Sequence, residues 1–327
     1  MKNKKIILAG GSGFIGQEMI RYFGKDNEVI VLTRKVNDGK TNRNNYESLH
    51  EQDLANVRWV KWDARTPGDW CTELENAAII INLAGRTVNC RYTKKNKQEI
   101  FDSRVFATAV IGESIRKCKN PPGLWINSSS ATIYRDASYK SQDEYNGEIL
   151  DDFSAKVCKL WEKTFFEQIT PATRKVALRM AITLGPGGVM IPYFNLLKFA
   201  LGGQQGNGKQ MYSWIHSEDT CRIIEWIDDH KEMNGAYNCS TPGVVSNKEF
   251  MRILRKVTGH KLGLPAYGWM IRLGALIIGT EPELILKSRW VLPTRLIESG
   301  YQFKYPELKE ALTDIIRQVP RSQYHLF

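Results

Sequence analysis

Short runs of apolar and β-branched residues alternate with amphipathic stretches over roughly the first 180 residues of the chain. The stretch after the first run, FIGQEMIRYF (14–23), has helical spacing. Strands that alternate with helices predict a parallel sheet joined by right-handed crossovers. The runs have the length and composition of buried strands; they are KIILAG (5–10), EVIVLTR (28–34), VRWVKWD (57–63), AIIINLAG (78–85), LWINSSS (124–130) and VALRMAI (176–182).

A second helical pattern lies between the fourth and fifth predicted strands. Its small and apolar positions recur at intervals of three and four residues and would face the sheet; they are Phe101, Val105, Thr108, Gly112 and Ile115. Residues 37–56 are almost wholly polar instead, so we expect a surface insertion there.

The pattern loosens after about residue 184 into glycine-rich and proline-containing pieces. We therefore expect an α/β protein, with a Rossmann-type doubly wound parallel sheet in residues 1–184 and a smaller C-terminal lobe in residues 185–327. The lobe would close over the carboxyl ends of the strands, where such sheets bind ligands. Its most apolar segment, 269–279, contains Arg272 and is half the length of about 20 residues that a membrane span needs, so no span is expected.

Composition narrows the class of protein that this pattern allows. The net charge is +11, but Lys and Arg are spread along the whole chain, so we expect anionic small molecules as ligands and no nucleic-acid partner. The six cysteines form no Cys-x-x-Cys or Cys/His cluster, which indicates reduced thiols, no metal site and a cytoplasmic protein. The apolar run behind the basic N-terminus is too short for a signal peptide. The oligomeric state is not indicated.

Three glycines at intervals of three, Gly10, Gly13 and Gly16, stand between the first predicted strand and its helix. This spacing lets the turn be tight and lets the backbone approach a pyrophosphate, whose oxygens would face the amide groups at the helix N-terminus. The alternative is a tight turn that holds no ligand. A P-loop is excluded because no Gly-Lys-Ser/Thr follows.

The end of the second predicted strand carries Thr33, Arg34 and Lys35, where an NAD-preferring domain offers a carboxylate to the ribose hydroxyls. A guanidinium suits a 2′-phosphate through bidentate, charge-assisted hydrogen bonds. The sequence therefore favours NADP(H), unless Arg34 is only a solvated charge. Asp63, at the end of the third strand, would accept a hydrogen bond from the adenine amino group or would fix a turn.

Several motifs carry a family resemblance. The glycine spacing, NLAG at 82–85 and SSSATIY at 128–134 resemble the extended short-chain dehydrogenases/reductases, a superfamily that includes nucleotide-sugar epimerases. Four longer motifs narrow this to its atypical epimerase-like family with a C-terminal domain of unknown function (DUF1731); they are INLAGRTVNCRYTKKNKQEIFDSRV (81–105), GGQQGNGKQMYSWIHSEDT (202–220), STPGVVSNKEF (240–250) and VLPTRLIESGYQFKYPELKEAL (291–312).

The resemblance implies a Rossmann-type domain that binds NADP(H), and it assigns roles position by position. Gly10, Gly13, Phe14 and Ile15 would contact the pyrophosphate, Thr33 and Arg34 the adenosine end, Asp63 the adenine, and Leu83, Ala84 and Gly85 the ribose region. Ser130 would supply the catalytic hydroxyl that hydrogen-bonds a substrate carbonyl or alcohol beside the nicotinamide. Alternatively, Ser130 satisfies only its own backbone.

The chain departs from the superfamily at the Tyr-x-x-x-Lys pair, in which the ammonium lowers the pKa of the phenol. In DDFSAKVCKLWEKTF (151–165), the residues four positions before the three lysines are Asp152, Ala155 and Lys159. Tyr305 and Lys309 have the spacing, but Pro306 interrupts them and they lie far from the fifth strand. The usual pair is therefore absent.

Other residues could supply the proton. Tyr134 follows Ser130 by four residues, and Lys156 or Lys159 could reach the cofactor hydroxyls from the helix. Arg104 stands where many superfamily members carry Asn. The list of candidates also includes His216, which is more often a packed or helix-entry residue, and Asp219, which we expect to fix a loop or a helix N-terminus.

Two classes of function fit these residues. The first is an NADP(H)-dependent oxidoreductase or epimerase-like enzyme that acts on an unidentified small molecule with a non-standard active site built from Ser130 and Tyr134. The second is an NADP(H)-binding sensor or scaffold with little or no catalysis. The fold does not distinguish them, because one Rossmann framework hosts both.

Overall fold

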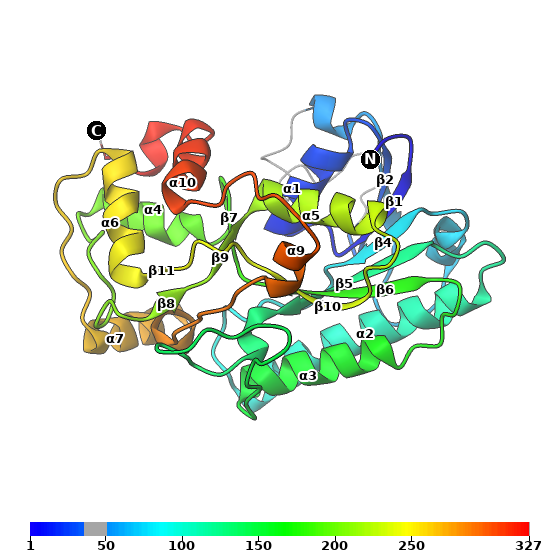
Figure 1. Ribbon diagram of the computed structural model, residues 1–327, viewed down its shortest axis with the longest axis horizontal. Coiled ribbons are helices and arrows are strands. Elements are labelled where there is room, and N and C mark those ends of the chain that lie inside the picture. Colours follow the sequence, from blue (N-terminus) through cyan, green and yellow to red (C-terminus); the bar gives the residue numbers. More distant parts are fainter. Residues whose placement is uncertain (36–50, 327) are drawn as a thin grey trace.

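The computed structural model describes residues 1–35 and 51–326 (Figure 1). Residues 36–50 lie outside the described part, and they include most of the expected polar insertion, 37–56. Its end, residues 51–56, includes the short helix η2 (Glu51–Leu54), in which Asp53 is buried rather than exposed.

The central sheet has seven parallel strands in the order β10-β6-β5-β4-β1-β2-β3. This confirms the predicted α/β fold and all six predicted strands. The reversal of strand order between β1 and β4 creates the crevice at which doubly wound sheets bind ligands. The strands are β1 (Lys5–Ala9), β2 (Glu28–Thr33), β3 (Val57–Lys61), β4 (Ile79–Asn82), β5 (Leu124–Ser130), β6 (Arg174–Met180) and β10 (Gly235–Cys239).

Helices cover both faces of this sheet (Figure 1). Helices α1 (Phe14–Phe23) and α5 (Ser217–Asp229) pack on one face, where Ile6 and Leu8 belong to their core cluster. Helices α2 (Lys94–Lys117) and α3 (Phe153–Phe166) pack on the other face. Successive strand residues point to opposite faces, so a run such as IIL in β1 serves both cores.

The chain returns to the sheet after residue 184, the predicted end of the Rossmann domain. After β6 and β7 (Ile182–Leu184) it leaves the sheet, and it then comes back through α5 and the seventh strand, β10. Residues 217–239 thus complete the sheet layer, although the sequence analysis placed them in the C-terminal lobe. The apolar face of α5 and the buried half of β10 pack on α1 and β6, which explains the return.

A second core lies beside the sheet and belongs to the smaller lobe. It joins α4 (Met190–Lys198), α6 (Asn247–Thr258) and α10 (Leu308–Arg317) around Trp214 and Phe250. The short strands β8 (Met211–Tyr212) and β11 (Val245–Ser246) pair with each other, and β9 (Trp214–His216) pairs with β7. The remaining helices are α7 (Gly268–Ile278), α8 (Glu283–Leu286), α9 (Thr294–Glu298), η3 (Asp69–Leu74), η4 (Ala131–Ile133) and η5 (Arg321–Gln323).

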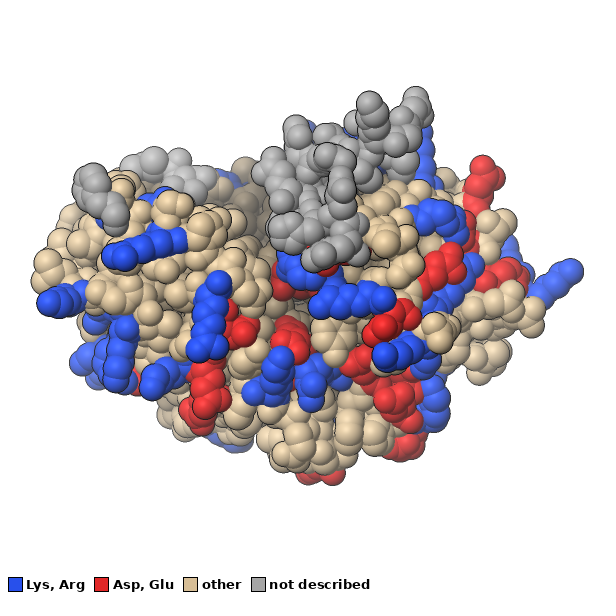
Figure 2. Space-filling view, turned by 90° about the horizontal axis from the view of Figure 1, so that it is seen from above, with Lys and Arg blue, Asp and Glu red and all other residues tan. Residues whose placement is uncertain are grey.

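No helix of the described residues is long and apolar enough to cross a membrane. Figure 2 shows Lys and Arg interspersed with Asp and Glu over the middle and right of this face, and mostly Lys and Arg at its left end.

Candidate functional site

The glycine turn between β1 and α1 is built for close backbone contact. Gly10 has φ of 78°, and a Cβ there would lie 2.8 Å from the Cα of Ala84 on the neighbouring strand end. A Cβ at Gly16 would overlap the backbone of Gly11. Because Gly16 has no side chain, α1 packs tightly against the turn that precedes it. Gly13 differs from both, because a Cβ there would meet no atom within 4 Å. That free space opens in front of the N-terminus of α1.

A cavity of about 980 Å³ opens at this turn, along the carboxyl ends of β1 to β4. Eight of the ten residues expected to bind the cofactor line it; they are Gly10, Gly13, Thr33, Arg34, Asp63, Leu83, Ala84 and Gly85. The other two, Phe14 and Ile15, form the start of α1 and are not part of the lining. The Phe14 ring packs against Gly185 and Gly188 of the loop after β7.

One end of the cavity carries the basic residues that follow β2. Arg34 and Lys35 are exposed and line the cavity together with Trp62 and Arg65. No carboxylate in the described ranges forms an ion pair with either Arg34 or Lys35. Both cations are therefore available to an anionic ligand at this end.

Asp63 fixes a turn at the same end of the cavity. Its Oδ1 accepts hydrogen bonds from the backbone amides of Arg65 and Thr66, each at 2.8 Å, and its Oδ2 accepts one from the Thr66 hydroxyl at 2.6 Å. These bonds hold the pKa of Asp63 below its usual value. The carboxylate keeps lone pairs toward the cavity, so the expected contact with an adenine amino group stays a prediction.

A buried polar network supports residues 83–85, which line the cavity. Asn82 at the end of β4 accepts a hydrogen bond from the Ala84 amide at 3.0 Å. Its amide nitrogen donates to Asn127 on β5 at 2.7 Å and to Thr108 on α2 at 3.2 Å. Trp161 of α3 also donates to Thr108, at 3.0 Å. The network fixes the backbone of 83–85 against the sheet.

Ser130 ends β5 and caps the short helix that follows. Its Oγ accepts hydrogen bonds from the Thr132 amide at 3.3 Å and from the Thr132 hydroxyl at 3.0 Å. The side chain therefore satisfies local backbone, which was the alternative reading, while its own hydroxyl proton stays free to donate to a ligand.

Tyr134 lies in a buried network. Its hydroxyl donates to Asn238 Oδ1 at 3.0 Å and accepts from Arg179 Nη1 at 2.7 Å. Arg179 in turn forms a bidentate pair with Glu162, at 2.9 and 2.8 Å, and Glu162 also accepts from the Ser129 hydroxyl at 2.6 Å. Burial raises the pKa of Tyr134. The network joins β5, β6, β10 and α3 directly behind Ser130.

Helix α3 turns Cys158 toward Thr132 and Trp161 toward Thr108, instead of its lysines, whereas Ser154 donates to Glu283 at 3.3 Å. Cys158 Sγ lies 3.5 Å from the Thr132 hydroxyl, and burial raises the pKa of its thiol to about 11. Lys156 and Lys159 both pair with Asp151 on the exposed side of the helix, at 3.2 and 2.8 Å. The lysines therefore point away from the cavity.

The sequence analysis did not single out Cys158. Helical spacing places it three residues before Trp161 on one face of α3, but the sequence does not show which face of this helix is buried.

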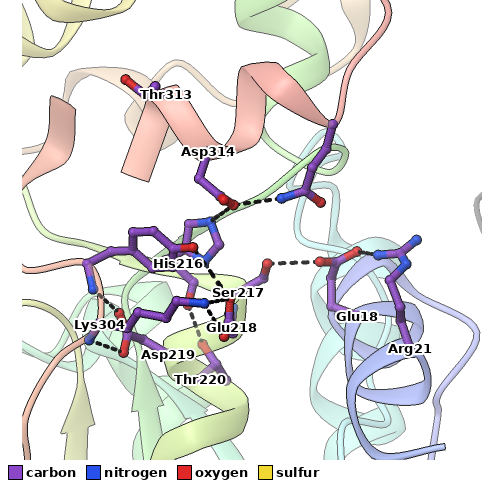
Figure 3. Close-up of polar contacts among 12 residues, drawn as sticks. Glu18, Arg21, His216, Ser217, Glu218, Asp219, Thr220, Lys304, Thr313 and Asp314 are labelled. Carbon is purple, nitrogen blue, oxygen red and sulfur yellow. Dashed lines mark hydrogen bonds and ion pairs between the residues drawn. The ribbon is translucent and has the colours of Figure 1, made fainter. Parts of the chain in front are cut away.

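His216 and Asp219 join the lobe to the sheet (Figure 3). His216 caps α5, with Nδ1 accepting from the Glu218 amide at 3.1 Å, and burial lowers its pKa. Asp219 is fully buried and accepts from the backbone amides of Lys304 and Tyr305, at 2.8 and 2.9 Å. This confirms that His216 is a packed helix-entry residue and that Asp219 fixes a loop.

The sheet order and the glycine turn at its first β–α junction define a Rossmann-type α/β protein. The chain belongs to the NAD dependent epimerase/dehydratase family, whose model matches residues 6–240. Residues 268–315 match the domain of unknown function DUF1731. Both matches confirm the resemblance drawn from the motifs.

Two relatives that match over nearly their whole length are also named epimerase family proteins. The chain is 30% identical over 316 residues to Epimerase family protein SSP1921 of Staphylococcus saprophyticus, covering 96% of this chain and 99% of that one. It is 30% identical over 315 residues to Epimerase family protein YfhF of Bacillus subtilis, covering 95% and 97%.

Two solved structures illustrate the shared fold. Human epimerase family protein SDR39U1 (isoform 2), solved with NADPH, superposes with a TM-score of 0.81 at 24% identity, covering 96% of this chain and 99% of that one. UDP-N-acetylglucosamine 4-epimerase of Methanobrevibacter ruminantium superposes with a TM-score of 0.73 at 18% identity, covering 97% and 98%.

Proposed function

We propose that the protein binds NADP(H) in the cavity along β1 to β4 and is an oxidoreductase or epimerase-like enzyme acting on a small molecule. The observation that carries the proposal is the juxtaposition, in one cavity, of the open space at Gly13 with the basic end at Arg34 and Lys35. A pyrophosphate fits the first feature and a 2′-phosphate the second. The human relative solved with NADPH supports this choice of dinucleotide.

In this proposal each of the site residues has its own role in binding the dinucleotide or the substrate. Gly10 and Gly13 allow the backbone to approach the pyrophosphate, Arg34 binds the 2′-phosphate, and the 83–85 backbone holds the ribose. The nicotinamide, when bound, supplies or accepts a hydride at the substrate carbon. Ser130 donates its hydroxyl proton in a hydrogen bond to the substrate oxygen, since its lone pairs already accept from Thr132. For Tyr134 the surrounding bonds favour a positioning role over the proton donor expected from the sequence.

Arg34 provides the direct test of the cofactor. A charge-assisted hydrogen bond contributes about 1.5–3 kcal/mol, so we expect NADPH to bind at least about tenfold more tightly than NADH. Arg34→Ala should remove most of that difference and leave NADH binding nearly unchanged. Calorimetric titration of both dinucleotides at one fixed salt concentration measures it. Arg65→Ala, a change at the same cavity end, serves as the control.

Equal affinities of the wild type for NADPH and NADH would refute the choice of NADP(H). A variant that loses both dinucleotides alike would show that Arg34 supports the fold of the cavity instead of reading the 2′-phosphate.

A second pair of variants distinguishes the role of Ser130 from that of Tyr134. Ser130→Ala should diminish any NADPH-dependent reduction of carbonyl compounds without changing NADPH affinity. Tyr134→Phe removes the hydroxyl between Arg179 and Asn238, so we expect a lower unfolding midpoint but an unchanged pH profile of the remaining activity. A pH profile that changes in Tyr134→Phe would restore Tyr134 as proton donor, and unchanged rates in Ser130→Ala would remove Ser130 from the mechanism.

The alternative is an NADP(H)-binding sensor or scaffold. It is favoured by the position of Lys156 and Lys159, which face solvent on α3 and leave the usual Tyr-x-x-x-Lys chemistry unsupported. Consumption of bound NADPH on addition of cell extract would decide for the enzyme.

A further inference from the structure

Arg104 of α2 lies beside Gly85, a lining residue of the cavity, and has no acidic partner among the described residues. A Cβ built at Gly85, which lines the cavity, would lie 3.1 Å from the Arg104 Cζ. Arg104 Nη1 donates to the backbone carbonyls of Arg86 and Ile100, at 3.1 and 3.0 Å. The guanidinium covers the ring of Trp161 on α3, with 4.9 Å from Cζ to the ring centroid. Burial lowers the pKa of Arg104, so its charge is poorly solvated.

Arg289 is a second arginine whose guanidinium is largely buried and has no ion pair among the described residues. It comes from the segment of the C-terminal lobe that follows α8, where its backbone amide donates to Met211 at 2.8 Å. Its Nε is buried and has no hydrogen-bond partner, and its Nη1 donates only to the adjacent carbonyl of Ser288, at 3.2 Å. Burial lowers the pKa of Arg289 as well.

The carboxylates near Arg289 are already engaged. Asp152 and Glu283 both pair with Lys287, at 2.8 and 2.9 Å. Asp136 accepts a hydrogen bond from the Ser288 amide at 3.1 Å. None of the three forms an ion pair with Arg289 in the described ranges, although all three act on it from a distance.

Both arginines are held against α3. The segment of Arg289 is fixed to the N-terminal end of this helix by the ion pair between Lys287 and Asp152, at 2.8 Å. Trp161 packs under Arg104, and Cys158, which lies between Asp152 and Trp161 in the sequence, turns its thiol toward the Ser130–Thr132 turn. That thiol is no counter-ion, because burial raises its pKa to about 11. Tyr92, the other titratable group facing Arg104, is also neutral near pH 7, since burial raises its pKa to about 12.

Two poorly solvated guanidiniums that form no ion pair among the described residues are costly unless an anion completes the arrangement. Each guanidinium has five donors, and the unused donors of both match the paired oxygens of a carboxylate or phosphate. We propose that Arg104 and Arg289 together bind a compact oxyanion of the substrate, a carboxylate or a phosphate group, beside Cys158 and Ser130. This rests on the proposed function, which places the reacting carbon at Ser130, and it makes the substrate an anionic small molecule.

Calorimetric titration of inorganic phosphate and, separately, of acetate into the NADPH-saturated protein tests the proposal. The bound dinucleotide occupies the other phosphate positions. We expect at least one of the two anions to bind once per chain, with Kd on the order of 1 mM. Arg104→Gln and Arg289→Gln should each weaken that binding at least about tenfold and leave NADPH affinity unchanged. Phosphate alone would indicate a phosphorylated substrate, and acetate alone a carboxylic acid.

Controls keep each outcome decisive. Arg91→Gln changes a guanidinium that already pairs with Glu281, at 3.3 Å, and should not change anion affinity. Arg104→Lys and Arg289→Lys keep the charge but lose the planar fork, so they should bind the anion with intermediate affinity even if a Gln variant does not fold. Absence of binding to the wild type, or equal binding by wild type and folded variants, overturns the proposal.

The anion site and the proposed function fail in different ways. If the wild type does not bind NADPH, the proposed function falls. The same anion titration on Arg34→Ala without dinucleotide then still decides whether Arg104 and Arg289 form a site.

Discussion

Glu162→Ala is expected to lower the free energy of unfolding by about 3–5 kcal/mol, because it leaves the Arg179 guanidinium buried without its counter-ion. Glu162 holds Arg179 through two hydrogen bonds and also accepts one from Ser129. Its removal therefore breaks these polar contacts of α3 with β5 and β6. Equilibrium denaturation in urea, followed by far-UV circular dichroism, measures the loss.

The matched control for this change is Glu249→Ala. Glu249 and Arg252 form a bidentate pair of the same geometry, at 2.6 and 2.7 Å, on the exposed side of α6. Exposed pairs contribute little, so this variant should unfold close to the wild type. The double variant Glu162→Gln/Arg179→Met should lose less stability than Glu162→Ala, because no buried charge remains unpaired. Equal, small losses in Glu162→Ala and Glu249→Ala would show that water reaches the network.

Gly16→Ala should mainly lower stability, whereas Gly13→Ala should mainly weaken cofactor binding. A Cβ at Gly16 overlaps the Gly11 backbone, which has no side chain to move, so α1 must shift at a cost of about 1–3 kcal/mol. Gly13→Ala should cost less than about 1 kcal/mol, since its Cβ meets no atom within 4 Å. The same methyl group stands where the proposed pyrophosphate lies, so NADPH affinity should fall at least about tenfold.

Chemical denaturation and NADPH titration of both variants separate these effects. A Gly13→Ala protein that binds NADPH as tightly as the wild type would contradict the placement of the pyrophosphate. A Gly16→Ala protein with unchanged stability would show that the turn adapts without moving α1.

The sequence predicted most of the sheet because its signals are local. A run such as AIIINLAG favours a buried strand whatever lies beside it, and glycines at 10, 13 and 16 have meaning within a single turn. The same holds for Thr33 and Arg34, since their place at a strand end puts them at the carboxyl edge of a parallel sheet. That Thr33 and Arg34 line the cavity could therefore be predicted.

The polar contacts around Ser130 and Tyr134 could not be predicted in the same way, because they depend on distant segments of the chain. The sequence favoured Tyr134 by its proximity to Ser130, but the fold surrounds its hydroxyl with Arg179 from β6 and Asn238 from β10. Likewise, periodicity alone does not say which face of α3 looks toward β5, so Cys158 was missed while the lysines were considered. The sequence also did not predict that the chain returns to the sheet through β10, because β10 pairs with β6, a strand far away in the sequence.

The sequence by itself determined the parallel α/β class, the family, and the glycine turn and basic residues that line the cavity, because strand pattern, glycine spacing and charge type each act over a few residues. Only the tertiary structure decided which polar groups are paired. It satisfies Tyr134 and Asp219 within the protein and leaves Arg104 and Arg289 without acidic partners among the described residues. The physical reason is that pairing depends on distance and burial, which segments far apart in the chain create only when they pack together.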